Sequence, residues 1–430
     1  MWQPSADATG RHLAARTVRQ PDRPASPCAP NRAARQEGRT IRKILKGLGL
    51  LLLAVIAGIA IYLAMHARAV RNMARVSGVA VTDVSKFTPA ETVKGCPGTP
   101  LAPAPQGALP AATFAAMRAW SDQRGGVGLL VMVDGRIAGE AYAKGVTAET
   151  RTHSNSMHKS VVAMLLGAAL ADGTIKSADD PVGSYVPELK DDPRGKITLR
   201  QLLSMASGLK NPSMAKMDSA AFEIMLGDVS EAALSLPLEG KAGTFNYNNA
   251  NLQLAGTALA GALERAGKGR YAGYLSQKVW CPLGNRDAQL WLEYEGGSPR
   301  YFAYLNASVR DWARVGELIR RGGEWNGQQL IPADWIAAIT APSPGNPNYG
   351  MGIWRGSPWT RERRYSKEVA MTVPQREAFL AGDVVYFDGF GGQRVYVVPS
   401  AKLVIARAGE PVTDWDESAL VNLALKGLAH

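Results

Sequence analysis

Cysteine and histidine are scarce in this chain, which has only three cysteines and five histidines in 430 residues. Cys28, Cys96 and Cys281 lie far apart, and none has the spacing of a metal-binding pair. No zinc motif, Walker loop or dinucleotide-binding fingerprint stands out either. These absences argue against a structural metal and against a nucleotide cofactor. We therefore expect a protein that works with its own side chains and needs neither a metal nor another cofactor.

The excess of basic residues is confined to the beginning of the chain. Residues 1–75 carry 13 Lys and Arg against three Asp and Glu, whereas the remaining residues carry 36 against 34. The formal net charge of +12 is therefore a property of the N-terminal segment. A nucleic-acid-binding surface would need such an excess within a folded domain. We expect no nucleic-acid partner.

Charged residues are absent from Gly47 to Met65, a run of 19 residues. A helix of this length, at about 1.5 Å per residue, crosses the hydrocarbon core of a bilayer. Lysines and arginines precede the run, so the positive-inside rule leaves the N-terminus in the cytoplasm. We predict a single-pass transmembrane anchor over 47–66 in the inner (cytoplasmic) membrane, with the rest of the chain facing the periplasm or exterior. A cleaved signal sequence is the alternative, because Ala67 to Ala69 has the small-x-small pattern of a cleavage site.

Composition divides the remaining chain into three parts. Residues 1–46 are rich in Arg, Ala and Pro without apolar periodicity, which predicts a disordered basic segment. Residues 67–108 end in a stretch dense in Pro and Gly, which predicts a linker. We expect the folded domain over 109–430. Cys96 and Cys281 would then lie in an oxidising compartment, where they either form a disulfide or remain two free thiols.

Strand-like and helix-like patterns both occur in the folded part. Val127–Val133 and Ile137–Ala143 are separated by Asp134 and Gly135, a strong hairpin signal. Residues 176–300 are mostly helical in pattern. Further strand-like runs follow towards the C-terminus: Tyr349–Trp354, Asp383–Phe387, Arg394–Val398 and Leu403–Arg407. Strands joined by hairpins predict an antiparallel sheet flanked by helices, in an α/β (α+β) fold with a helical subdomain at about 176–300.

The pattern Ser-x-x-Lys occurs three times, as Ser156/Lys159, Ser207/Lys210 and Ser213/Lys216. A chain of this length contains roughly one copy by chance, so the spacing alone identifies nothing. Only Ser156 leads into a helical pattern, Val161–Ala171, that is apolar on nearly every side and should therefore be buried. Burial lowers the pKa of a lysine, and a neutral lysine can take the proton of a serine one helical turn away. We therefore select Ser156 as the candidate nucleophile and Lys159 as its base.

A serine nucleophile also needs a proton carrier for the leaving group and hydrogen-bond donors for the oxyanion. Tyr247 and Asn249, in the stretch Phe245–Asn249, could supply a hydroxyl and an amide. The glycine-rich stretch 389–393 leads into a strand-like run, where glycine lets a ligand approach the backbone closely. A packed loop aromatic and an ordinary glycine-rich turn are the alternatives at these two places.

The order Ser-x-x-Lys, Tyr-x-Asn and then a glycine-rich turn resembles the serine β-lactamase and penicillin-binding-protein superfamily. It is most similar to the class C β-lactamase-like branch, which includes esterases and 6-aminohexanoate-dimer hydrolases. Connecting stretches agree with that branch: Asp179–Val182, Tyr185–Leu189, Ile197–Leu203 and Pro282–Gly284. The resemblance spans about 110–428 and implies a β-lactamase-like serine hydrolase.

The resemblance also implies a role for each motif residue. Ser156 would be the nucleophile, Lys159 its base and Tyr247 the proton carrier to the leaving group. Asn249 would position the substrate or Lys159. The backbone N–H groups of Ser156 and Phe390 would form the oxyanion hole, with Gly391 following in the substrate-binding turn.

The third motif departs from the family pattern. Where relatives carry Lys-Thr-Gly or His-x-Gly, this chain has Phe387, Asp388 and Gly389. The cation that would bind the carboxylate of a β-lactam is missing, and Asp388 adds a negative charge. We therefore expect poor β-lactamase and carboxypeptidase activity, and Asp388 in the substrate site predicts an amine-bearing or neutral substrate.

Together these patterns predict a membrane-anchored serine hydrolase that cleaves a small-molecule ester or amide. One alternative is a penicillin-binding-like receptor that keeps the fold without catalysis, but a retired site has no physical need for Ser156, Lys159 and Tyr247 together. The other is an acyl transferase with the same acyl-enzyme, which the sequence does not separate from a hydrolase. The sequence does not give the oligomeric state.

Overall fold

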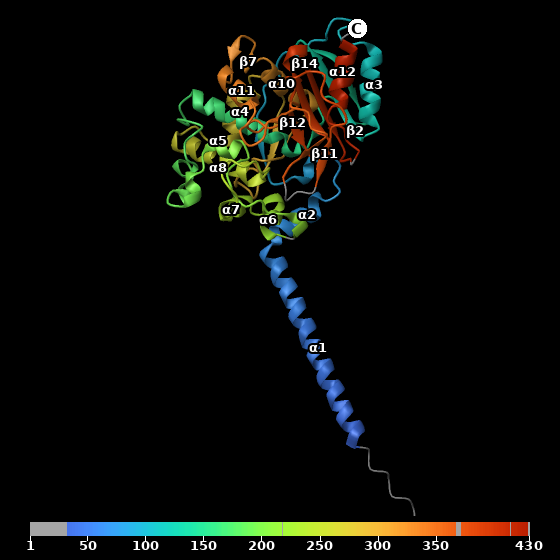
Figure 1. Ribbon diagram of the computed structural model, residues 1–430, viewed down its shortest axis with the longest axis vertical. Helices are drawn as coiled ribbons and strands as arrows, with labels where there is room; N and C mark the ends of the chain where they lie inside the picture. Colours follow the sequence, from blue (N-terminus) through green and yellow to red (C-terminus); the bar gives the residue numbers. More distant parts are fainter. Residues whose placement is uncertain (1–31, 217, 367–370, 413, 429–430) are drawn as a thin grey trace, which may run out of the picture. The chain divides into compact units, whose positions relative to one another are not determined.

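The computed structural model describes residues 32–216, 218–366, 371–412 and 414–428 (Figure 1). The chain divides into two compact units, one ending at Ala64 and the other beginning at Met65.

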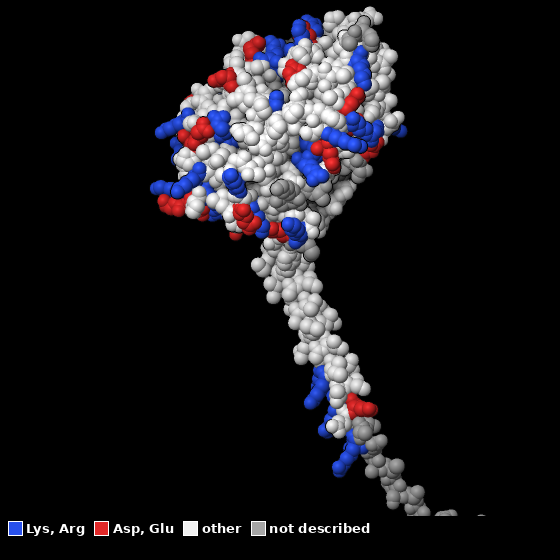
Figure 2. Space-filling view, in the orientation of Figure 1, with Lys and Arg blue, Asp and Glu red and all other residues white. Residues whose placement is uncertain are grey.

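Within the described residues, the first unit consists of one long helix, α1 (Arg32–Met65), whose last residue belongs to the second unit. Its apolar side chains are exposed to the surroundings, as at Leu50 (68%) and Leu53 (63%). Figure 2 shows lysines and arginines gathered on its first half and none on the apolar half. The helix is long and apolar enough to be a membrane anchor or a signal sequence.

The expectation of disorder up to residue 46 is wrong for 32–46, which belong to α1. Arginine, lysine, alanine and glutamine are good helix formers, so the helix extends from the apolar run back into the basic stretch. The remainder of that expected segment, residues 1–31, lies outside the described residues.

The centre of the second unit is a six-stranded antiparallel sheet with strand order β3-β2-β14-β13-β12-β9. Its strands are β2 (Gly126–Val133), β3 (Arg136–Tyr142), β9 (Trp354–Arg355), β12 (Val385–Gly389), β13 (Gln393–Val398) and β14 (Leu403–Gly409). The predicted turn at Asp134 and Gly135 joins β2 to β3, and both residues have positive φ, as a two-residue hairpin turn requires. The predicted antiparallel sheet is confirmed.

Helices cover both faces of this sheet. Val395 and Val397 of β13 lie against Gly316 of α10 (Val309–Arg320). Arg394 and Tyr396, which alternate with them, bind Glu417 on the opposite face. On that opposite side α3 (Ala111–Asp122) and α12 (Ala419–Leu428) pack side by side (Figure 1). The sheet is therefore a buried middle layer, as the α/β (α+β) prediction requires.

Helices are the main regular elements of the region 176–300, as predicted, and turns and loops make up about half of it. Its helices are α5 (Leu199–Leu203), α6 (Ser219–Leu226), α7 (Val229–Ser235), α8 (Asn249–Arg265), α9 (Tyr271–Leu275) and a π-helical turn, Ser276–Trp280. The region also contains a strand, β5 (Ala288–Trp291), that the sequence pattern did not separate from its helical surroundings. Smaller elements lie beyond it: β7 (Glu324–Trp325), β8 (Gln328–Gln329), α11 (Ala333–Thr340), β10 (Glu362–Arg364) and β11 (Thr372–Pro374).

The expected linker over 67–108 is largely wrong, because its first part is built into the body. Helix α2 (Ala67–Val76) packs on α6, and β1 (Ala90–Val93) is an outer strand of a second sheet with order β1-β5-β6-β4. That sheet also contains β4 (Arg151–Thr152) and β6 (Leu305–Ser308).

Burial and a disulfide hold this N-terminal segment in place. Val81, Phe87 and Val93 are buried in the body, and Cys96 forms a disulfide with Cys281. Of the two states that the sequence left open for these cysteines, the structure therefore has the disulfide. Apolar residues too widely spaced to form a periodic pattern anchor the segment, whereas proline and glycine dominate only after Lys94.

Candidate active site

Ser156 lies in a 3-10 turn, Asn155–Met157, that leads directly into α4 (His158–Ala171). Asn155 has a φ of +47°, a left-handed conformation that asparagine tolerates better than most residues. Every residue of α4 from His158 to Ala169 is buried. The serine therefore stands half-buried at the start of a helix that runs through the core.

The Lys159 side chain is held by three oxygen atoms. Its Nζ atom lies 2.8 Å from Ser156 Oγ, 2.9 Å from Asn249 Oδ1 and 2.9 Å from the carbonyl oxygen of Phe302. A neutral amine has two N–H bonds and one lone pair. When Asn249 and Phe302 accept the two N–H bonds, the lone pair faces the Ser156 hydroxyl.

Burial lowers the pKa of Lys159 well below its usual value, and the negative charge of Asp388 opposes this effect only in part. The residue is 1% exposed, so its charged form has lost nearly all hydration. The neutral amine that can accept a proton is thereby favoured.

Tyr247 completes the arrangement from the loop that precedes α8. The Lys159 Nζ atom lies 4.9 Å from the centre of the Tyr247 ring, and the phenol is hydrogen-bonded to Ser156. Its ring is stacked on Trp354, with the ring centres 5.6 Å apart. Burial, with smaller contributions from Tyr349 and Asp388, raises the pKa of Tyr247 well above 10. This phenol therefore keeps its proton and is suited to donate it.

The Ser207/Lys210 copy does not form such a pair, and Lys216 of the third copy is exposed. Ser207 Oγ is hydrogen-bonded to Asn251 Oδ1 and accepts the Leu209 N–H, within a buried loop. Lys210 forms an ion pair with Asp218 instead. Selecting Ser156 by the burial of its helix agrees with this geometry.

The glycine-rich turn lies beside the serine, as the sequence predicted, but its residues do different things. At the end of β12, Gly389 lies so close to the Ser154 carbonyl that a Cβ would be 2.4 Å from its oxygen. The Phe390 carbonyl accepts a hydrogen bond of 2.8 Å from Asn155 Nδ2. Gly391 has positive φ and lies against Pro411, so it shapes the turn and does not line the cavity at Ser156.

The expectation that Asp388 offers a negative charge to the substrate is wrong. Its carboxylate binds Arg394 at 2.6 Å and Arg363 at 3.2 Å, and it accepts a hydrogen bond of 2.7 Å from Tyr365. Glu417 shares both guanidinium groups, at 2.9 Å from Arg363 and 2.7 Å from Arg394. Two arginines thus neutralise two carboxylates, and Asp388 lines the cavity as part of a closed ionic cluster.

This cluster contains residues that sequence reasoning did not find. Arg363 is 5% exposed and stacks on Trp354, with Cζ 4.0 Å from the ring centre. It thereby supports the ring on which Tyr247 rests. Its own segment, Arg361–Arg364, is rich in charge and indicates a solvated loop, so no local signal marked it.

A cavity of about 390 Å³ opens at Ser156, between α6 and the glycine-rich turn. Tyr247, Asn249 and Asp388 line it together with Ser156 and Phe390. Tyr247 is half-buried because one part of its ring faces this space. The catalytic groups that the sequence indicated therefore surround a volume in the range of small-molecule sites.

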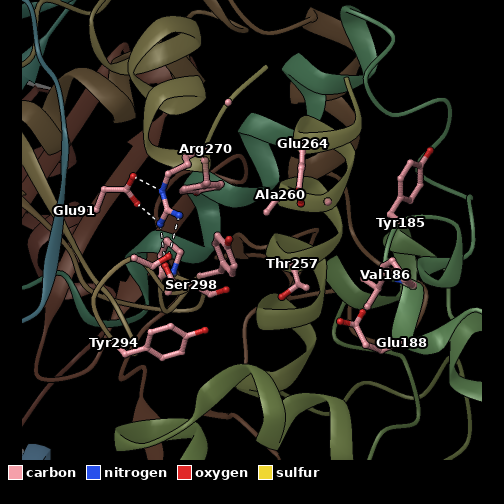
Figure 3. Close-up of a pocket in the computed structure, with 18 of the residues that line it drawn as sticks. Glu91, Tyr185, Val186, Glu188, Thr257, Ala260, Glu264, Arg270, Tyr294 and Ser298 are labelled. Atoms are coloured by element: carbon pink, nitrogen blue, oxygen red, sulfur yellow. Dashed lines mark hydrogen bonds and ion pairs between the residues drawn. The ribbon is translucent and has the colours of Figure 1, made fainter. Parts of the chain in front are cut away.

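A larger hollow of about 710 Å³ lies elsewhere, between α8 and the loops near Tyr185 and Gly296 (Figure 3). Its arginine, Arg270, is bound by the Glu91 carboxylate at 2.7 and 3.0 Å and by the Gly296 and Gly297 carbonyls. Its lining includes neither Ser156 nor Lys159. The candidate catalytic residues therefore favour the smaller cavity, and not this hollow, as the candidate active site.

Comparison with known proteins gives concordant matches. Residues 110–408 match the family model described as Beta-lactamase. The 6-aminohexanoate-dimer hydrolase of Paenarthrobacter ureafaciens is 26% identical over 298 residues, which cover 65% of this chain and 71% of that protein.

Solved structures share the fold. A candidate 6-aminohexanoate-dimer hydrolase from Bacillus anthracis has a TM-score of 0.63 at 21% identity, covering 81% of this chain and 91% of that one. A family VIII carboxylesterase has a TM-score of 0.53 at 17% identity, covering 74% and 98%. At such identities the likeness concerns the fold alone.

Proposed function

Because this chain belongs to the beta-lactamase family, we propose that it is a membrane-anchored serine hydrolase that cleaves an ester or amide bond of a small molecule. The observation that carries the proposal is the Ser156 hydroxyl 2.8 Å from the nitrogen of a buried lysine. A buried lysine is costly unless its neutral form is used, and here that form faces a hydroxyl at the mouth of a cavity.

Acylation begins with the transfer of the Ser156 proton to Lys159. The Ser156 oxygen forms a bond to the substrate's carbonyl carbon, and the carbonyl oxygen becomes an oxyanion. The N–H groups of Ser156 and Phe390 are the proposed donors to that oxyanion, since Gly389 brings this turn against the serine's own loop. The bond to the leaving group then breaks.

Tyr247 gives its proton to the leaving alcohol or amine and is reprotonated from Lys159. Its raised pKa suits this role, because the phenol keeps its proton until the leaving group needs it. Water then attacks the acyl-enzyme, the acid leaves and Ser156 recovers its proton. Asn249 is proposed to orient Lys159, whose nitrogen lies 2.9 Å from its oxygen.

The cavity suits a neutral substrate. None of its described lining residues is a lysine or arginine, and the nearby Arg363 and Arg394 are neutralised by Asp388 and Glu417. A substrate carboxylate would be desolvated there without a cation to bind it. Poor activity on β-lactams is expected for this reason.

We also propose that α1 stays attached as the anchor. Its apolar stretch is long enough to cross a bilayer, and basic residues precede it. The hydrolase would then face the periplasm or exterior of the inner membrane. The size of the mature protein on electrophoresis tests this. A size that matches a chain beginning near residue 70 would contradict the anchor and support cleavage.

Active-site labelling tests the proposal. The full chain in detergent should react with a fluorophosphonate, and Ser156→Ala should not react. Ser207→Ala, which removes the serine of another Ser-x-x-Lys copy, is the matched control and should still be labelled. Absence of labelling in the folded wild type would favour the non-catalytic receptor, and stable labelling by a fluorescent penicillin would favour a cell-wall enzyme.

A further inference from the structure

The cavity at Ser156 is polar only at its catalytic end. Most of the rest of its wall is apolar, and its apolar residues include Met214, Ala221, Ile224, Met225, Met371 and Phe390. Met, Ile and Phe side chains bind hydrocarbon by burying apolar surface, and they offer almost no hydrogen bonds. This lining fits the acyl part of a substrate better than a sugar or a peptide.

The polar groups in the same wall are already used within the protein. Asn211 Nδ2 donates to Asn246 Oδ1 at 2.6 Å and to the Tyr247 carbonyl at 2.9 Å. Asn248 Nδ2 donates to the Lys210 carbonyl, and its Oδ1 accepts the N–H of Ala250 in the first turn of α8. Beside these two amides, a polar substituent on the substrate would lose water and would have to compete with hydrogen bonds that the protein already makes.

Apolar side chains also stand exposed at the mouth of the cavity. Met214 is 52% exposed, Met371 40% and Phe390 53%. Each of these three both lines the cavity and faces the surroundings. An apolar chain could therefore enter along a continuous apolar path.

Helix α6, which forms part of the apolar wall, is hydrogen-bonded to the segment that follows α1. Helix α6 supplies Ala221, Ile224 and Met225 to the cavity. Its Glu223 is bound by the His66 ring at 2.5 Å, and its Leu226 carbonyl accepts a hydrogen bond of 2.6 Å from Asn72 of α2. Since α1 ends at Met65, the residue after the anchor contacts the helix that lines the cavity.

We propose that this cavity is an acyl-chain site, and that its substrates are neutral amphiphilic esters or amides taken from the membrane that holds α1. The proposal rests on the proposed function and deepens it by naming the substrate class. In the reaction, Ser156 Oγ bonds to the acyl carbon, the ester C–O bond breaks and the alcohol leaves with the proton. Water then releases the fatty acid.

The size of the cavity sets the chain length. A volume of about 390 Å³ corresponds to roughly a dozen groups of ~30 Å³, the share of one water molecule. An acyl chain of roughly eight to ten carbons with its ester group fills this space. Longer chains would project through the open mouth.

The first experiment measures kcat/KM for 4-nitrophenyl esters from acetate to dodecanoate, with the full chain in detergent. We expect a rise of roughly threefold per methylene until the cavity is full. Met214→Glu and Met371→Glu should lower the ratio of decanoate to acetate activity at least tenfold. Leu238→Glu, at an exposed leucine outside the cavity, is the control and should leave the ratio unchanged.

The second experiment distinguishes membrane from water as the source. The full chain is reconstituted into phosphatidylcholine vesicles, and didecanoylglycerol is placed either in the same vesicles or in separate ones. Hydrolysis at least tenfold faster in the same vesicles supports a membrane source, and equal rates overturn it.

A flat response to chain length would overturn the acyl-chain site. If Ser156-dependent hydrolysis persists in that case, the proposed function stands and only the substrate class falls. Loss of all Ser156-dependent hydrolysis in the folded protein would instead remove the proposed function, so the two failures are distinguishable.

Discussion

The nitrogen of Lys159 and the ring of Tyr247 lie 4.9 Å apart, and burial displaces their pKa values in opposite directions. Desolvation disfavours whichever form is charged, so it lowers the pKa of the amine and raises that of the phenol. At neutral pH the lysine is thereby favoured as a proton acceptor and the tyrosine as a proton donor. The same apolar surroundings therefore shift both residues towards the protonation states that the proposed acyl transfer needs.

The pH dependence of activity follows from the lowered pKa of Lys159 and the raised pKa of Tyr247. The proposed mechanism requires neutral Lys159, so kcat/KM should rise with pH through a lysine pKa that lies well below 10.5. Tyr247 must stay protonated, and its raised pKa should leave no decline near pH 10. The measurement is a pH profile of kcat/KM for a neutral ester between pH 4 and 11, within the range of stable folding. A rise centred near 10.5 would show that Lys159 is not the base.

Tyr247→Phe separates proton donation from nucleophilic attack. The variant should lose on the order of a hundred- to ten-thousand-fold in kcat/KM for an alkyl ester or amide, whose leaving group needs a proton. Loss on a 4-nitrophenyl ester should be much smaller, because nitrophenolate leaves without one. Equal losses on both substrates would point to a structural role for the ring on Trp354 and not to proton transfer.

Asn249→Asp tests the positioning of Lys159. A carboxylate at 2.9 Å from the lysine nitrogen should favour the ammonium form and raise the pKa of Lys159. The acidic limb of the pH profile should therefore move to higher pH, with activity recovering in alkaline buffer. Asn249→Ala removes the contact without adding charge and is the control for lost geometry. If the acidic limb of the pH profile does not move in Asn249→Asp, Asn249 does not control the pKa of Lys159.

His158 should make the folded state sensitive to acid. It is fully buried, its Nδ1 faces the Arg300 and Ala303 carbonyls and its Nε2 lies 2.9 Å from the Tyr271 hydroxyl. Carbonyls only accept, so Nδ1 carries the proton and Nε2 accepts from the tyrosine. Burial lowers the pKa of His158 from 6.5 to about 4.

The unfolded chain therefore binds this proton more tightly than the folded one, and stability should fall as pH drops from 6.5 towards 4. The loss from this residue is at most about 3 kcal/mol, since a tenfold difference in proton affinity is worth about 1.4 kcal/mol. Guanidinium unfolding of the full chain in detergent, followed by tryptophan fluorescence, measures it. The variant His158→Gln should be less stable at pH 7 but should depend less on pH, and an equally steep dependence would assign the effect to other groups.

The sequence predicted the central sheet and the helices on it because their signals are local. Asp134 and Gly135 are typical of a two-residue turn with positive φ and predict the hairpin, and β13 and β14 are short, largely apolar runs separated by a turn. The buried helix after Ser156 could be recognised from its lack of any polar face. The same local evidence brought Ser156 and Lys159 to the centre of the candidate site.

What the sequence missed depends on contacts between distant segments. β1 is a strand of only four residues, and it is defined by its pairing with β5, almost two hundred residues later in the chain. The charge of Asp388 appeared available because its partners, Arg363 and Arg394, have no periodic or spacing signal. Burial of charge is decided by tertiary structure, so local patterns do not report it.

The stretch of chain shared with the family is shorter than the stretch that folds together. The family match ends at residue 408 and begins at 110, whereas β1, Cys96 and Glu417 all lie outside it. A protein trimmed to the shared stretch would leave β5 as an unpaired sheet edge and two buried arginines with one carboxylate between them. The boundaries of the family match and of cooperative folding therefore differ here, and a shortened chain that keeps the second unit intact should start near Met65.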